Sequence, residues 1–111
     1  MSEPEDQSEA VLLVVTTADR SEAERIGEAL VEKRLAASGS VIPMIHSFLY
    51  YEGQLQRQHE ALLLLKTSAE RSAEAQAELR DLHSYENPQI LEIAVSGGSA
   101  RYIAWLLEEV R

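Results

Sequence analysis

Two runs of consecutive apolar residues constrain the fold of this chain more than any other feature. They are residues 11–15 (VLLVV) and 62–65 (LLLL). A strand with one face in water alternates apolar and polar residues, and neither run does so. Both faces of a sheet built from these strands need cover, and a chain of 111 residues supplies too few helices for that. We therefore expect other copies of the chain to cover the second face.

Changes of periodicity along the chain predict four strands and three helices. Strands are expected at residues 10–17, 35–51, 55–66 and 90–95, and helices at 22–33, at 69–82 and from Ser99 to Arg111. Gly53 marks a hairpin turn, and Pro43 marks a bend or bulge in the second strand. Ser21 and Thr67, each followed three residues later by glutamate, are the predicted N-caps of the first two helices. The order predicts an α+β, ferredoxin-like βαββαβ fold with a four-stranded antiparallel sheet and an added C-terminal helix.

Composition and charge restrict the partners. The chain carries 19 acidic and 10 basic residues, for a net charge of −9. Residues 1–9 are rich in acids and predict a disordered tail before a single domain at 10–111. An acidic surface disfavours nucleic acid, and no apolar run has the length of a membrane span. The chain has no cysteine and no signal-peptide pattern, so a cytoplasmic location is expected.

Chemically capable side chains gather at His83, Tyr85 and Glu86, just before Pro88 and the last apolar strand. Imidazole and carboxylate suit borderline cations, so His83 and Glu86 are candidate ligands of Cu(II) or Zn(II). Two ligands do not make a tight site, and Glu60, His59 or a neighbouring subunit would have to complete it. The alternative is that His83 and Tyr85 cap a helix and hydrogen-bond across an interface.

Four further side chains are expected to line a pocket at the subunit interface. They are Tyr85, Glu60, Lys66 and Trp105. Lys66 can reach an anion at the start of the following helix, although a solvated strand end or an ion pair is the commoner outcome. Trp105 lies on the apolar stripe of the last helix, which favours packing against the core or a partner. For His46 and His59, an exposed or interface role is favoured over metal ligation.

Taken in order, several motifs resemble the CutA family, small proteins named for divalent-cation tolerance. The resemblance spans residues 11–107. Its motifs are VVTT (14–17), EAERI (22–26), LVEKRLAA (30–37), EG (52–53), LLLKT (63–67), HxYExPxI (83–90) and YxxWL (102–106). The last two, at their correct separation, are the most specific.

The resemblance implies a compact homotrimer similar to the PII signalling proteins, with divalent metal or copper binding and a response to metal ions. It places the suspected pocket at the His-Tyr-Glu cluster near the subunit interface, here His83, Tyr85 and Glu86. This chain departs from the family pattern at Ser38, where a cysteine is usual. A hydroxyl is a poor ligand for Cu(I), so a thiolate copper site is not expected.

Two competing hypotheses remain. One is a PII-like scaffold that binds a small molecule and has no metal function. The other is an enzyme with His83 and Glu86 as an acid–base pair. No nucleophile, oxyanion loop or phosphate-binding glycine motif stands near these residues, so an enzyme is not expected.

Overall fold

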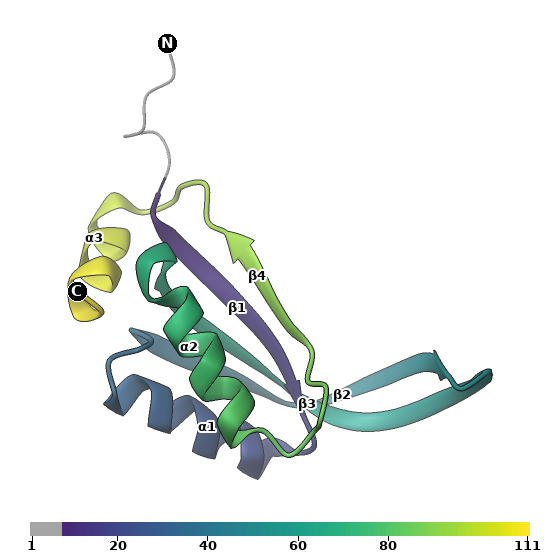
Figure 1. The fold of residues 1–111 in the computed structure, drawn as a ribbon. Coiled ribbons are helices and arrows are strands. Elements are labelled where there is room, and N and C mark those ends of the chain that lie inside the picture. The colour runs from purple at the N-terminus through teal and green to yellow at the C-terminus, as the bar shows by residue number, and fades with distance from the viewer. Residues whose placement is uncertain (1–7) are drawn as a thin grey trace.

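The structure, a computed structural model, describes residues 8–111. Four strands form one sheet in the order β2-β3-β1-β4, and every neighbouring pair is antiparallel. The elements are β1 (Ala10–Thr17), α1 (Arg20–Glu32), β2 (Ser38–Tyr51), β3 (Gln54–Ser68), α2 (Ala69–Leu82), β4 (Ile90–Ala94) and α3 (Ala100–Glu109). Helices α1 and α2 lie on one face of the sheet, and α3 lies at the end where β1 begins (Figure 1). This confirms the predicted ferredoxin-like plan with an added helix.

The core lies between the sheet and helices α1 and α2. The central strands β1 and β3 contribute alternate residues to it, and all of them are fully buried. They are Leu13, Val15, Leu63 and Leu65, which pack with Ile26, Leu30, Ala75 and Leu79 of the helices. Alternation follows from the strand period of two, which turns every second side chain towards the helices.

The intervening residues of β1 and β3, with their register partners on β2 and β4, form a second apolar surface, which we call the open face. It comprises Leu12, Val14, Ile42, Leu62, Leu64, Leu91 and Ile93, because Leu12 pairs with Ile93, Val14 with Leu64 and Leu91, and Ile42 with Leu62. Leu91 and Ile93 are 54% and 49% exposed. The apolar runs therefore do supply both faces of the sheet, as predicted. What covers the open face stays a prediction.

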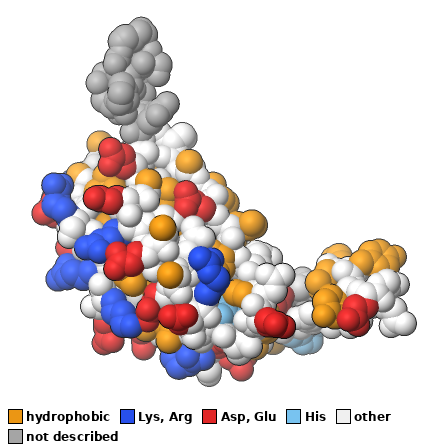
Figure 2. Space-filling model, viewed as in Figure 1, with side chains coloured by type: hydrophobic (Ala, Val, Ile, Leu, Met, Phe, Trp, Pro, Cys, Tyr) orange, Lys and Arg blue, Asp and Glu red, His pale blue; other side chains and the backbone are white. Residues whose placement is uncertain are grey.

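The β2–β3 hairpin continues past the sheet as an arm, residues 45–60 (Figure 1). The register shifts between Ile42 and Ile45, which confirms the irregularity predicted at Pro43. At the turn, Glu52 and Gly53 have φ angles of 54° and 79°, as a two-residue hairpin loop with two left-handed positions requires. Hydrophobic side chains gather at the tip of the arm (Figure 2).

The predicted N-caps of α1 and α2 are wrong, by two residues and by one residue. The N-cap of α1 is Asp19 rather than Ser21, and its carboxylate accepts a hydrogen bond from the Glu22 amide. The spacing to a glutamate is the same for both residues, but Glu22 turns back and accepts from the Ala18 amide, whereas Glu24 pairs with Arg20. The N-cap of α2 is Ser68 rather than Thr67, whose hydroxyl donates to the Leu35 carbonyl instead.

Other boundaries also differ from the predictions. β2 begins at Ser38 rather than at residue 35, because the amides of Leu35 and Ala36 donate back to the Leu30 carbonyl at the end of α1. β3 extends to Ser68, whereas β4 ends at Ala94 and α3 at Glu109. Residues 1–7 of the predicted tail lie outside the described residues. Glu9 accepts a hydrogen bond from the Ala69 amide, so its backbone belongs with the domain.

Candidate functional site

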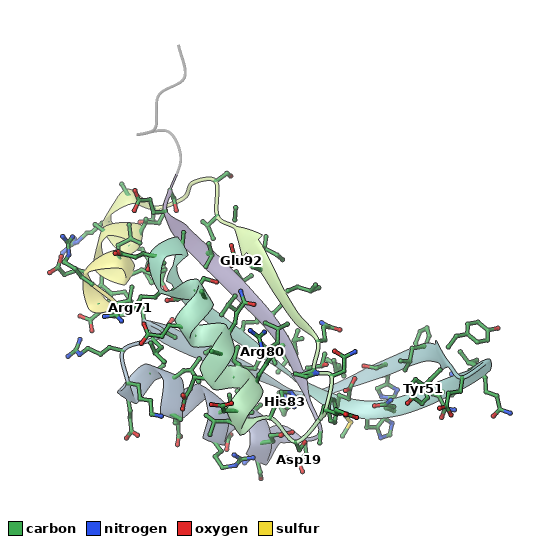
Figure 3. All side chains as sticks on the ribbon, viewed as in Figure 1. Asp19, Tyr51, Arg71, Arg80, His83 and Glu92 are labelled. Atoms are coloured by element: carbon green, nitrogen blue, oxygen red, sulfur yellow. The ribbon has the colours of Figure 1, made fainter. Side chains whose placement is uncertain are left out.

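His83 caps the C-terminus of α2, and its imidazole is fully buried (Figure 3). Nε2 lies 2.8 Å from the Thr16 carbonyl oxygen at the end of β1. Nδ1 accepts a hydrogen bond of 3.1 Å from the Tyr85 amide. A carbonyl can only accept and an amide can only donate, so these partners specify the neutral tautomer with its proton on Nε2. Both ring nitrogens are therefore engaged.

The carboxylate of Glu22, on the first turn of α1, lies beside this ring. It accepts hydrogen bonds from the amides of Ala18, at 2.9 Å, and Ser84, at 2.7 Å. Burial by itself would raise the pKa of Glu22, but these hydrogen bonds hold it below its usual value. Glu22 thus joins the start of α1 to the loop after α2.

Tyr85 makes the second link in this region. Its hydroxyl donates a hydrogen bond of 2.7 Å to Glu60 on β3, and its ring lies 4.8 Å from that of His83, centroid to centroid. Burial and the Glu60 carboxylate raise the pKa of the Tyr85 phenol. The predicted proximity of Tyr85 and Glu60 is observed, and together with His83 they form one continuous cluster.

The predicted metal ligands His83 and Glu86 do not form a ready site within one chain. Glu86 is exposed and makes no hydrogen bond or ion pair to another described residue. A metal ion at His83 would have to replace either the Thr16 or the Tyr85 hydrogen bond. Within residues 8–111, no group of three or more His, Cys, Asp or Glu side chains is arranged around a common metal position. This site stays a prediction.

Lys66 and Trp105 lie away from that cluster. Lys66 pairs with Leu12 near the start of β1, and its ammonium donates to the Ser40 hydroxyl at 2.7 Å. Trp105 is half-exposed on α3, where its ring lies 5.7 Å from that of Tyr102. The structure therefore brings together two of the four predicted pocket residues and leaves these two at the other end of the sheet.

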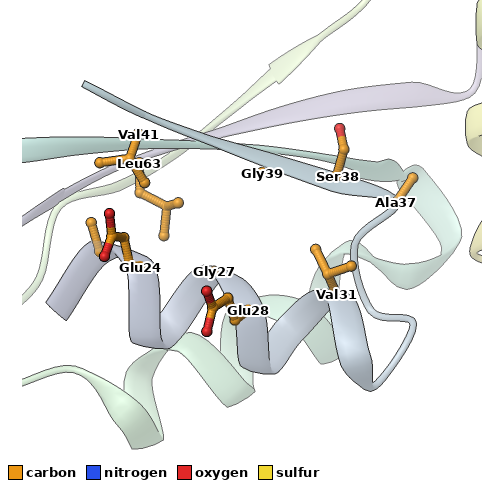
Figure 4. Close-up of a pocket in the computed structure, with 10 residues that line it drawn as sticks. Glu24, Gly27, Glu28, Val31, Ala37, Ser38, Gly39, Val41 and Leu63 are labelled. Atoms are coloured by element: carbon orange, nitrogen blue, oxygen red, sulfur yellow. The ribbon is translucent and has the colours of Figure 1, made fainter. Parts of the chain in front are cut away.

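A groove of about 370 Å³ between α1 and β2 contains none of the predicted site residues (Figure 4). It is lined by Ala23, Glu24, Gly27, Glu28, Val31, Ala37, Ser38, Gly39, Val41 and Leu63. Gly27 and Gly39 let α1 and β2 approach the central strand: a Cβ on either would lie 3.1 Å from a leucine methyl of β3. In the sequence, the only sign of this groove is the small residues Ala23 and Gly27 on one face of α1. The same spacing is expected of a helix face that simply packs against the core, so it does not predict a groove.

The sequence does not single out Glu22 as a site residue, because a glutamate in the first turn is also common in an ordinary helix. Its spacing from Asp19 is the one local indication of its role. The hydrogen bond with the Ser84 amide joins residues 62 positions apart, and no local sequence pattern predicts such a contact.

The protein is therefore of the ferredoxin-like α+β class. It has a cluster of hydrogen-bonded polar side chains around His83 at one end of the sheet, and the face of the sheet away from α1 and α2 is open. The chain belongs to the CutA1 family, since the family's sequence model, described as CutA1 divalent ion tolerance protein, matches residues 11–109.

Individual relatives agree with this assignment. A divalent-cation tolerance protein CutA from Pectobacterium atrosepticum is 34% identical over 103 residues, covering 93% of this chain and 94% of the relative. The solved structure of CutA from Xylella fastidiosa has a TM-score of 0.91 and 33% identity, covering 94% of this chain and 100% of that one. CutA from Archaeoglobus fulgidus has a TM-score of 0.88 and 33% identity, covering 92% and 99%. The descriptions of the Pectobacterium atrosepticum and Archaeoglobus fulgidus proteins both name divalent-cation tolerance.

The expected cytoplasmic location is wrong on these comparisons. The Archaeoglobus fulgidus structure is described as periplasmic. A relative from Arabidopsis thaliana, 27% identical over 111 residues that cover 61% of its length, is described as chloroplastic. Lack of cysteine is compatible with every compartment, so it could not carry that inference. Among the described residues, no helix is both long and apolar enough to cross a membrane.

Proposed function

We propose that this protein is a CutA-type homotrimer that binds a divalent cation in pockets between its subunits. The open face carries this proposal. It presents a contiguous apolar surface across all four strands, from Ile42 on β2 to Ile93 on β4. Surfaces of this kind are covered in stable proteins, and a second copy of the same chain has the matching chemistry.

The pocket in this proposal is bounded by the His83 cluster. Tyr85 and Glu60 form one wall, and His83 holds the loop that presents Glu86. Glu86 is exposed and free to meet a group on a second subunit. Carboxylate and imidazole donors, with Ser38 in place of a thiolate, favour Cu(II) or Zn(II) over Cu(I). His83 itself becomes a ligand only if one of its two hydrogen bonds is given up.

Native mass spectrometry of the parent, with and without Cu(II) or Zn(II), tests assembly and metal uptake together. A trimer that takes up metal stoichiometrically is expected. The Glu86→Gln and His83→Asn variants should stay trimeric and lose the metal ion bound in each pocket, so that they take up fewer ions per trimer than the parent. Glu70→Gln, which changes an exposed carboxylate on α2, is the matched control and should bind as the parent does.

A small-molecule scaffold is the second candidate, and it is favoured by the engagement of both His83 nitrogens. In that case the trimer forms, and metal uptake is the same in the parent, Glu86→Gln and His83→Asn. A monomer at micromolar concentration would contradict both candidates.

A further inference from the structure

The arm carries two histidines directly opposite each other. His46 on β2 is the register partner of His59 on β3. Their ring centroids are 4.5 Å apart and the rings are tilted by 56°. Both side chains are exposed, and neither ring hydrogen-bonds to another described residue. The chain has 3 histidines, and the third, His83, has both nitrogens bonded. Free imidazole is therefore concentrated at this one place.

Opposed strand positions suit a shared ion. Side chains directly across an antiparallel ladder start from Cβ atoms about 4.5–5.5 Å apart. Zinc binds imidazole nitrogen at about 2.0–2.1 Å, so two nitrogens on one ion are separated by at most about 4 Å. Rings with centroids 4.5 Å apart reach that arrangement by side-chain rotation alone. Imidazole is a good ligand for zinc, copper and nickel.

The surroundings leave room for the ion and further ligands. The two rings border a hollow of about 230 Å³, which is also lined by Ser47, Phe48, Arg57 and Gln58. The Arg57 guanidinium lies over the Phe48 ring, 6.0 Å from its centroid, in the next ladder pair on this side of the arm. Its positive charge weakens cation binding and does not occupy the space between the imidazoles. Glu60 points to the opposite side of the ladder and bonds Tyr85.

We propose that His46 and His59 together bind one divalent transition-metal ion, with the remaining coordination positions taken by water or by a group from outside the chain. The site is separate from the His83 pocket and does not depend on it. Binding joins β2 to β3 in the part of the hairpin that has no helix against it, so it also stabilises the arm.

Calorimetric titration of Zn(II) into the full chain tests the site. The chain that carries Glu86→Gln, which lacks a proposed ligand of the subunit pocket, is the parent protein for these measurements. His46→Ala and His59→Ala should each weaken binding at least tenfold, and the double variant should abolish it. Gln56→Ala, an exposed substitution on the other side of β3, is the control and should change nothing. With Cu(II), paramagnetic resonance should show two coupled nitrogens in the parent and one in each single variant.

Amide hydrogen exchange provides an independent measurement. Zinc should slow exchange across the arm in the parent and leave it unchanged in His46→Ala. Equal zinc affinity in the parent and both single variants would overturn the proposal. So would binding whose nitrogen signal persists in the double variant. Native mass spectra of the same samples report assembly separately, so a failure of the trimer is distinguishable from a failure of this site.

Discussion

At the scale of single residues, the His83–Glu86 segment is organised around a carboxylate far away in the sequence. The Glu22 carboxylate accepts hydrogen bonds from the amides of Ala18, after β1, and Ser84, after α2. His83 then links the end of α2 to the end of β1 through the Thr16 carbonyl. These bonds join the segment after β1 and the segment after α2 to the start of α1. The segment's histidine is therefore a structural residue in the single chain.

Glu22→Gln is expected to destabilise the protein by about 2 kcal/mol at neutral pH, because a charged acceptor of two amides is lost and the new NH2 group faces one of them. The pKa of Glu22 is lowered from 4.5 in the folded protein. Its contribution is thus present above the unfolded pKa and is lost as the pH falls through the lower folded pKa. Urea unfolding at fixed protein concentration, at neutral pH and near pH 3, measures both effects.

The difference in unfolding free energy between the parent and Glu22→Gln should be smaller near pH 3 than at neutral pH. Glu24→Gln, which alters an exposed carboxylate on the same helix, should cost well under 1 kcal/mol at either pH. A gap for Glu22→Gln that is the same at both pH values would contradict the assigned role.

Tyr85→Phe is expected to cost about 1–3 kcal/mol, because it leaves the buried Glu60 carboxylate without the hydroxyl. The raised pKa of Tyr85 also predicts that its phenol ionises above the ordinary value of 10. Subtracting the ultraviolet pH titration of Tyr85→Phe from that of the parent gives the ionisation of the Tyr85 phenol alone. Tyr50→Phe serves as the control, since its side chain is exposed on the arm. Ionisation of Tyr85 at or below the ordinary value would refute the assignment.

At the scale of elements, the arm differs from the rest of the sheet because no helix packs against it. Its cohesion depends on ladder hydrogen bonds, on cross-strand pairs such as Phe48 with Arg57, and on the turn. The bulge at Pro43 and Met44 separates it from the helix-covered part of the hairpin. We expect it to be the part of the sheet most sensitive to turn chemistry.

Gly53→Ala should destabilise the arm by about 1–2 kcal/mol, because Gly53 has a φ of 79° and a Cβ is strained there even though no atom lies near it. Glu52→Asn should have the opposite sign, since asparagine tolerates the φ of 54° better than glutamate does. Amide exchange of the arm in both variants measures the effect. Faster exchange in Glu52→Asn than in the parent would show that the turn does not control the arm.

At the scale of the whole molecule, the open face decides how the protein exists in solution. Leu91→Glu places a charge in that face at a position 54% exposed in the single chain. The protomer should therefore still fold, whereas assembly should be lost, because the charge would be buried without a partner in a subunit interface. Light scattering with circular dichroism separates the two outcomes.

Ala73→Glu adds the same charge on an exposed position of α2 and should leave the assembly intact. If Leu91→Glu assembled as the parent does, the open face would not be the contact between copies.

Sequence patterns are enough to predict the element order, the ferredoxin-like plan and the need to cover two sheet faces. These properties follow from periodicity, which local runs such as residues 11–15 and 62–65 record directly. The sequence also identifies Gly53 as a turn residue, because only a few residue types tolerate a positive φ. The N-cap of α1 does not follow from the sequence, since Asp19 and Ser21 both suit an N-cap and each is followed three residues later by a glutamate.

Tertiary structure alone decided which polar groups meet. Glu22 with Ser84, Tyr85 with Glu60, and His46 with His59 are separated in sequence and are joined by register and packing. The residue pattern makes His83 a candidate ligand, but only its three-dimensional neighbours show that both ring nitrogens are engaged. The sequence favours an exposed or interface role for His46 and for His59, and the antiparallel pairing of β2 with β3 sets the two face to face. The residue type sets which interactions a side chain can make, and the tertiary structure sets which partner lies close enough to make them.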